Sequence, residues 1–130
     1  MATPRTTIAD QLRADHPDHK VYAYPYAPSE VRANVIAVWR TDVNPHPNSA
    51  NYLRHSLTIN AYGAATLEER AEAELDDLLD DILLSLQRVD GVTFTSAERT
   101  VYAESFQGWT VKATADSPNV YKSTVLSEGS

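Results

Sequence analysis

The sequence has no cysteine, and only four of its 130 residues are glycine. Without cysteine the chain has neither disulfides nor thiolate ligands for a metal, so synthesis inside a cell is the expected setting. The glycines, at positions 63, 91, 108 and 129, are too scattered to form a glycine-rich loop around a phosphate group. These shortages exclude several common kinds of metal and nucleotide site.

Long hydrophobic runs are missing as well. No stretch approaches the roughly 18 apolar residues of a membrane span, and the first residues, MATPRTTIADQL, lack the apolar core of a signal peptide. We therefore expect no membrane partner. Hydrophobic residues make up 42% of the chain and charged residues 22%, which is typical of a globular domain. We predict a single domain over residues 1–116, followed by a polar tail over residues 117–130.

Basic residues are few, with 11 Lys and Arg against 18 Asp and Glu, and the net charge is −7. The excess lies in residues 66–90, where nine acidic residues accompany only Arg70 and Arg88. Proteins that bind nucleic acid need clustered basic residues to neutralise phosphates. Since no such cluster is visible, we predict no specific binding to nucleic acid.

The first half of the chain predicts one helix and three strands. A short helix is expected over Thr6–Asp15, with Thr6 or Thr7 as its cap, and Pro17 ends it. Alternating apolar residues predict strands over residues 20–26, 31–43 and 52–63. Pro25 donates no ladder hydrogen bond, so we expect the first strand to be short or to lie at a sheet edge. VNPHPNSAN, residues 43–51, is rich in turn residues and is predicted as a loop.

The second half predicts a long helix and two strands. Thr66-Leu67-Glu68-Glu69 is typical of a capping box, and Asp90-Gly91 would end the helix near Val89. Residues 92–104 and 108–115 then predict a hairpin with its turn near Gly108. The order α-β-β-β-α-β-β indicates an α+β fold. We expect a mixed, mainly antiparallel sheet of about five strands with both helices packed on it.

The stretch ELDDLLDDILL, residues 74–84, raises the question of a metal or catalytic site. At helical spacing its leucines, apart from Leu84, and its isoleucine form one apolar stripe, and four aspartates lie opposite: Asp76, Asp77, Asp80 and Asp81. A charge run of this kind is usually a solvated helix face, which is the interpretation we favour. Leu84 falls among the aspartates. It is either a single exposed leucine or an apolar contact for a neighbouring subunit.

Catalytic and metal-binding patterns find little support in the sequence. His16 and His19 flank a proline and could bind a metal adventitiously, but no third ligand has suitable spacing. His55 lies on the apolar side of its strand, where a hydrogen-bonded core histidine is the more common case. The serines occur in no nucleophile-elbow context. We therefore expect no enzyme, no cofactor and no resident metal.

Tyrosines and the predicted loop favour association instead. Tyr22, Tyr24 and Tyr26 alternate along the predicted edge strand, and tyrosine is enriched at interfaces. The same tyrosines could simply cap the second face of the sheet. In the loop, the preferred contact residues are consecutive: Asn44, Pro45, His46, Pro47 and Asn48.

In their order and residue patterns, these segments resemble the tail terminator (tail-completion) proteins of long-tailed bacteriophages. The similarity covers roughly residues 5–116. The segments that carry it are YAYPY, VWRTDVNPHP, HSLTINAYG, TLEERAEAELDDLLDDILLSLQRVDGV and TVYAESFQGWTVKATA. The resemblance implies a structural virion protein without catalytic residues. Such a protein forms a ring, usually a hexamer, on the last ring of the tail tube, stops tube polymerisation and presents a surface to the head.

The implied partners are further copies of the chain, the tail tube protein and a head-closure or connector protein. The implied location is the head-proximal end of the virion tail, after assembly in the host cytoplasm. DNA would pass through the ring. Two alternatives stay open: another neck protein, such as a head-closure or connector subunit, or a small-molecule or metal-binding domain or enzyme that uses the acidic helix or His16 and His19.

Overall fold

The computed structural model describes residues 3–26, 34–63, 69–102 and 106–118. These residues form two helices and five strands in the predicted order, and they confirm the α+β class. The elements are α1 (Pro4–Asp15), β1 (Lys20–Tyr22), β2 (Val35–His46), β3 (Ser49–Tyr62), α2 (Glu69–Gln87), β4 (Val92–Tyr102) and β5 (Phe106–Pro118).

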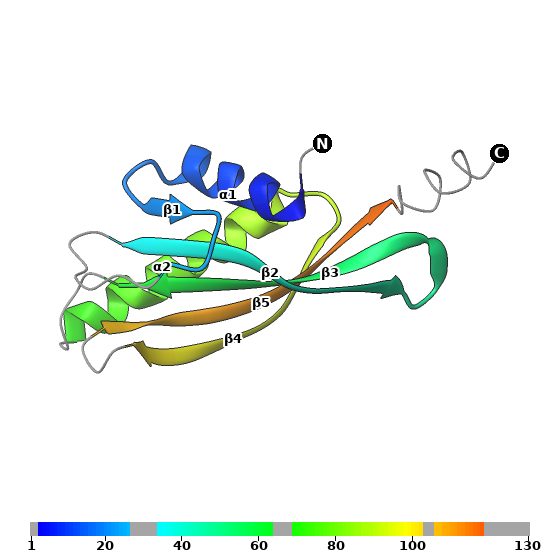
Figure 1. Ribbon diagram of the computed structural model, residues 1–130. Helices are drawn as coiled ribbons and strands as arrows, with labels where there is room; N and C mark the ends of the chain where they lie inside the picture. Colours follow the sequence, from blue (N-terminus) through cyan, green and yellow to red (C-terminus); the bar gives the residue numbers. More distant parts are fainter. Residues whose placement is uncertain (1–2, 27–33, 64–68, 103–105, 119–130) are drawn as a thin grey trace.

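The five strands form one sheet with the order β1-β2-β3-β5-β4. β1 runs parallel to β2, and every other neighbouring pair is antiparallel. β1 is an edge strand, as the sequence predicted. Both helices lie on the same side of the sheet, and the β2–β3 hairpin extends past them together with the end of β5 (Figure 1).

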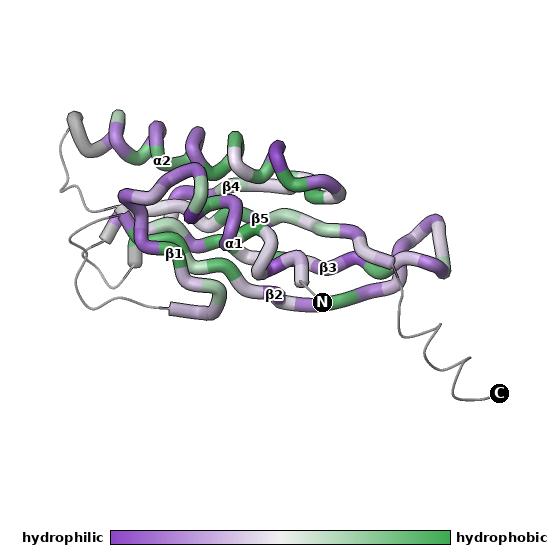
Figure 2. The backbone as a smooth tube through the Cα atoms, turned by 90° about the horizontal axis from the view of Figure 1, so that it is seen from above, coloured by the Kyte–Doolittle hydropathy of each residue, from purple (hydrophilic) through white to green (hydrophobic). Residues whose placement is uncertain are grey.

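The core lies between the helices and one face of the sheet. Val38, Ile59, Val111 and Ala97 follow one another across the sheet by strand register, so their side chains share this face. The helices contribute apolar residues at helical spacing: Ile8 and Leu12 from α1, and Leu75, Leu78, Ile82 and Leu86 from α2. Figure 2 shows hydrophobic stretches on α2 and on the strands near the helices, and a mainly hydrophilic hairpin tip. Burial of this apolar area is the main stabilising term of the fold.

Two contacts fix the position of α2 on the sheet. The Trp109 indole Nε1 donates a hydrogen bond to the Leu75 carbonyl over 2.9 Å. At Gly63, an added Cβ would lie 2.5 Å from Leu75 Cδ2, so a larger residue there would force the buried Leu75 side chain to shift. The helix therefore approaches the end of β3 closely at this glycine.

The second face of the sheet is apolar at one end. Val35 and Ala37 are buried there, although they point away from the helices. Tyr22 lies opposite Ala37 and stacks on Tyr26 with ring centroids 4.1 Å apart. The Tyr62 hydroxyl donates to the Tyr26 carbonyl over 3.0 Å. These tyrosine contacts occur within one subunit, as expected if the tyrosines cap this face.

Three predicted boundaries near the N-terminus differ from the structure. α1 is capped by Thr3 rather than Thr6 or Thr7, because Pro4 can occupy the first helical position, where no N–H is needed. Thr6 is the other member of this capping box, and its hydroxyl accepts the Thr3 N–H over 3.1 Å. The predicted strand over 20–26 ends at Tyr22, before Pro25. The next strand begins at Val35, and residues 31–33 lie outside the described part of the chain.

The prediction of a loop over residues 43–51 was wrong. β2 continues to His46 and β3 begins at Ser49, so only Pro47 and Asn48 form the turn. Prolines are tolerated in a strand beside an irregularity in the ladder, and the register shifts between Pro45 and His46. What composition predicted as a loop is the outer part of a long hairpin.

The boundaries in the second half also need correction. α2 ends at Gln87 rather than near Val89, and Gly91 ends the following turn with a φ of 79°. The predicted capping box falls on residues 66–69, of which 66–68 lie outside the described residues. Gly108 lies inside β5, where it pairs with Tyr62, rather than in a turn. Ser117 and Pro118, predicted as the start of a tail, pair with Leu53 and Tyr52.

Candidate functional site

The outer part of the β2–β3 hairpin, residues 41–54, forms an arm, the β2–β3 arm. Its strands are largely exposed, whereas the inner parts of β2 and β3 are buried under the helices. Val43 and Tyr52 keep 39% and 46% of their surface exposed, so the arm presents apolar area to solvent. The arm is therefore an ordered projection with surface available for contact.

An ion pair at the base of the arm joins it to β5. Arg54 Nε lies 3.0 Å from Asp116 Oδ1, and Arg54 Nη2 lies 3.3 Å from Oδ2. The Arg54 guanidinium holds the pKa of Asp116 below its usual range, and the carboxylate raises the pKa of Arg54. Paired hydrogen bonds of this kind fix geometry as well as charge. They hold the arm in line with the sheet.

The predicted contact residues of the former loop lie along this arm. Asn44 and Pro45 are exposed strand residues, and Pro47 and Asn48 form the tip. His46 is half-buried, and its Nδ1 accepts the Asn48 N–H over 3.0 Å. The structure thus brings all five residues together at one end of the molecule.

The other predicted contact residues are distributed over two places. Tyr22 and Tyr26 are half-buried in their stack, whereas Tyr24 is exposed. Leu84 is 59% exposed on the outer side of α2, where it lines a shallow pocket with Asp80, Leu83 and Gln87. This placement agrees with the interpretation of Leu84 as an exposed leucine on an acidic helix face.

The four aspartates of ELDDLLDDILL do not share one environment. Asp76, Asp77 and Asp80 are exposed, as a solvated helix face requires. Asp81 lies at the edge of that face, toward the segment that follows α1, and its carboxylate reaches His19. The structure therefore separates Asp81 from the other three.

The sequence HPDH, residues 16–19, forms the turn that carries both histidines. Pro17 cannot continue α1, and the His16 N–H still bonds to the Leu12 carbonyl at the end of the helix. The His19 N–H then bonds to the His16 carbonyl over 3.1 Å, which closes a four-residue turn. As a result the imidazole rings of His16 and His19 stack, with centroids 5.3 Å apart.

Asp81 completes a cluster with these two histidines. His19 Nε2 lies 3.4 Å and His16 Nδ1 lies 3.9 Å from Asp81 Oδ2. The ligand atoms of the three residues all lie within 4.8 Å of one another. The side chains of His16 and His19 are 16% and 8% exposed, and that of Asp81 is 38% exposed. The cluster is therefore mostly enclosed and open to solvent on the carboxylate side.

A hydrogen-bond chain orients the His16 ring. The Ser85 hydroxyl donates to Asp15 Oδ2 over 2.8 Å, so its oxygen is free to accept. His16 Nε2 lies 3.0 Å from that oxygen and 3.1 Å from the Asp81 carbonyl, which can only accept. Nε2 therefore carries a proton, and Nδ1 faces the Asp81 carboxylate.

Asp15 is the last group in this series of hydrogen bonds. Hydrogen bonds from Gln11 and Ser85, with a further contribution from Arg88, hold its pKa below the usual value. Serine, histidine and aspartate thus occur together, but the serine donates to the aspartate rather than to the histidine. In a catalytic triad the histidine lies between the other two and accepts the serine proton. This arrangement positions His16 and does not activate Ser85 as a nucleophile.

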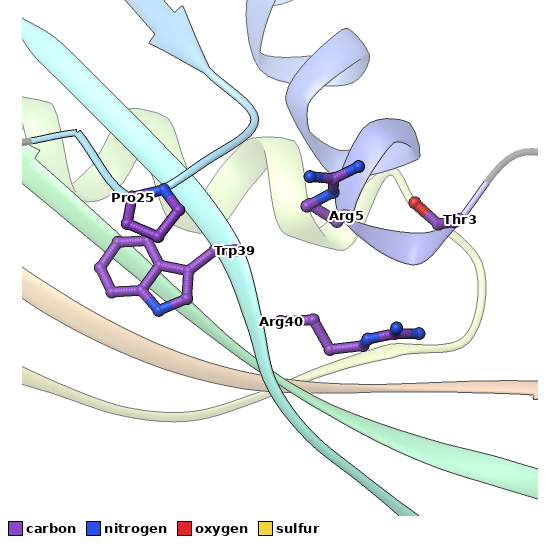
Figure 3. A pocket seen from close by; sticks show the side chains of 5 residues that line it. All are labelled: Thr3, Arg5, Pro25, Trp39 and Arg40. Atoms are coloured by element: carbon purple, nitrogen blue, oxygen red, sulfur yellow. The ribbon is translucent and has the colours of Figure 1, made fainter.

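A separate pocket lies beside the start of α1. Thr3 and Arg5 from the start of α1, Pro25, and Trp39 and Arg40 from β2 line it, and Pro25 lies over the Trp39 ring (Figure 3). Arg5 Nη1 donates to the Ala23 carbonyl over 2.7 Å, which anchors one of the two guanidinium groups. The pocket is thus basic and partly aromatic, although the whole chain is acidic.

Comparison with known proteins adds no family assignment. No protein-family model matches the chain, and no curated protein matches it. Within the described residues, neither helix is long and apolar enough to cross a membrane. The functional conclusion therefore depends on the geometry above and on the resemblance seen in the sequence.

Proposed function

We propose that the chain is a structural subunit that assembles into a ring at the head-proximal end of a phage tail tube, as a tail terminator. The β2–β3 arm is the observation that carries this proposal. An arm of this length adds little to the core of its own subunit, because its strands lie beyond the helices and are exposed. A partner that packs on the arm would bury its free apolar surface.

The arm is suited to contact because it is held in place before any partner arrives. A two-stranded hairpin alone is marginally stable in water. Here the end of β5 adds a third strand, and the Arg54–Asp116 pair joins the two elements. A preorganised arm loses little conformational entropy on binding, which favours assembly.

The two sides of the subunit differ in charge, which would suit a head-to-tail ring. The pocket with Arg5, Arg40 and Trp39 lies on the side of α1 and β2. The exposed aspartates of α2 lie on the other helix, which packs toward β4 and β5. A head-to-tail interface that repeats around a ring joins two different surfaces of the same chain. Opposite charges on those surfaces would favour this register.

Assembly can be tested with variants of the arm. We expect the Val43→Glu, Tyr52→Glu double variant to lose ring formation, because it places a charge at the exposed apolar residue on each face of the arm. Native mass spectrometry and sedimentation should show rings for the wild-type chain, alone or after addition of tail tubes. The double variant should remain a monomer with an unchanged melting temperature.

The matched control is the Val43→Ile, Tyr52→Phe double variant, which keeps shape and apolar area and should assemble as the wild type does. A wild-type chain that stays monomeric even with tail tubes present would refute the proposal. Leu84→Glu should leave the fold intact, and if it also leaves rings intact, Leu84 makes no subunit contact. Binding to a head-closure or connector protein without any binding to tubes would indicate a different neck protein.

Genomic neighbourhood gives an independent test. A tail terminator gene is expected beside genes for a major tail protein and a head-closure protein. A neighbourhood of metabolic genes would contradict the proposal without any biochemical experiment.

A further inference from the structure

The His16, His19 and Asp81 cluster has no role in the proposed ring, and its geometry points to a bound cation. We propose that these three side chains form a binding site for a divalent transition metal of the Zn²⁺ class. The site joins the turn after α1 to α2. The inference does not rest on the proposed function, because every group in it belongs to one chain.

The ligand types select the metal. Two imidazole nitrogens and one carboxylate oxygen are a typical donor set for Zn²⁺ and Co²⁺, whereas Mg²⁺ and Ca²⁺ prefer oxygen ligands alone. Three protein ligands leave a fourth tetrahedral position, and the partly exposed Asp81 carboxylate lies at the open side of the cluster. Water fills that position.

The distances are close to those that a metal needs. Bonds of about 2.0–2.2 Å place the ligand atoms of a tetrahedral Zn²⁺ roughly 3.4 Å apart. His19 Nε2 and Asp81 Oδ2 are already 3.4 Å apart, and His16 Nδ1 is 3.9 Å from the same oxygen. The ligand atoms of the three residues lie within 4.8 Å of one another, so the imidazole rings would have to rotate to bring all three atoms to coordination distance.

The surroundings of His16 are those of a metal ligand. A histidine that binds a metal through one nitrogen commonly donates its other N–H to a carbonyl or carboxylate, which fixes the tautomer. His16 Nε2 makes this bond to the Asp81 carbonyl and to Ser85 Oγ. On His19, Nδ1 lies 3.9 Å from Oδ1 of the exposed Asp18, which is too far for a hydrogen bond.

The sequence alone could not supply the third ligand. His16 and His19 are three residues apart in a turn, but Asp81 follows His19 by 62 residues. In the sequence, nothing separates Asp81 from the neighbouring aspartates Asp76, Asp77 and Asp80. Only the packing of α1 against α2 distinguishes it.

The test is titration of the purified, metal-free chain with ZnCl₂ in a calorimeter, together with melting curves. We expect one Zn²⁺ per chain and a higher melting temperature, since a ligand that binds only the folded state stabilises it. MgCl₂ over the same range should leave the melting temperature unchanged. Co²⁺ should give the strong visible absorption of a tetrahedral site.

Variants decide whether the three residues act together. Asp81→Asn keeps the shape of the side chain and should weaken Zn²⁺ binding at least about tenfold, on the scale of changes around metal sites. His19→Gln should do the same. Asp80→Asn is the matched control, because it removes an exposed carboxylate from the same helical turn and should bind as the wild type does.

Two results would overturn the proposal. One is a wild-type chain that neither binds nor is stabilised by Zn²⁺. The other is Asp81→Asn binding as tightly as the wild type, which would leave only adventitious binding by the histidine pair. Ring assembly is not measured in this experiment, so its outcome is separate from that of the tail-terminator proposal.

Discussion

At the scale of single residues, His55 shows how a buried polar group is accommodated. It lies on the helix-facing side of β3 and is 5% exposed. Its Nε2 is 2.6 Å from Ser117 Oγ, and Arg40 Nη1 lies 3.5 Å from Nδ1. Because a guanidinium can only donate, Nδ1 accepts and the neutral ring carries its proton on Nε2. Burial, and then the nearby charge of Arg40, lower the pKa of His55.

This lowered pKa predicts a loss of stability in mild acid. In the unfolded chain His55 takes up a proton near its ordinary pKa of 6.5, whereas in the folded chain it stays neutral. The unfolded state is therefore favoured as the pH falls below about 6.5, and the loss continues down to the folded pKa. Melting temperatures measured at constant ionic strength should fall between about pH 7 and pH 5.

The His55→Gln variant should show a smaller fall over that range, because the titrating group is gone. Arg40→Gln should also reduce the fall, since removal of the positive charge returns the pKa of His55 toward its ordinary value. Equal slopes for the wild type and His55→Gln would show that other groups cause the pH dependence.

At the scale of elements, α2 illustrates how far a periodic pattern predicts structure. The prediction of an apolar stripe was confirmed: its residues have the spacing of a helix that packs on a core, and the sheet buries Leu75, Leu78 and Ile82. The hairpin was harder to predict, since Pro45 and Pro47 are turn residues in most contexts. In the fold the strand continues through Pro45, where the ladder is irregular. Long-range pairing thus outweighed local preference.

A pair of substitutions on α2 tests the assignment of its two faces. Ile82→Ala removes a fully buried side chain and should cost about 2–5 kcal/mol of unfolding free energy. Leu84→Ala, two residues further on, removes an exposed leucine and should change the free energy by less than about 0.5 kcal/mol in the monomer. Urea unfolding followed by circular dichroism measures both values. Similar losses for the two variants would mean that α2 is rotated on the sheet.

At the scale of the whole molecule, the main property is the uneven distribution of charge. The sequence predicted that the acidic residues would gather in one helix, and the structure shows where that helix lies. The exposed aspartates of α2 lie on the outer side of the helix. Whether a candidate site could be predicted depended on how far apart its residues are in the sequence. The proposed contact residues on the arm are close in sequence and were predicted together. The cluster with Asp81 joins segments that no sequence pattern connects.

The charge predicts weak interaction with DNA. Most of the affinity of proteins for duplex DNA comes from basic residues that release counterions from phosphates. A chain of net charge −7 should therefore leave the mobility of duplex DNA unchanged in a gel-shift assay, even at low salt. The triple variant Asp76→Lys, Asp77→Lys, Asp80→Lys should retard DNA, and added salt should abolish the effect. Retardation by the wild-type chain would reveal a basic surface that the net charge conceals.

The docking of α1 against α2 has a consequence for the order of folding. Hydrogen bonds join Asp15 and His16 to α2 and to Arg88 just after it, and they link residues between 65 and 73 positions apart. Closing so long a loop is slow, and its entropic cost must be met before the contacts form. During synthesis from the N-terminus, α1 can meet β1 and β2 early, but it lacks its contacts with α2 until residues 75–88 have been added. For that interval the side of α1 that α2 will cover stays open to solvent and is a surface to which chaperones would be expected to bind.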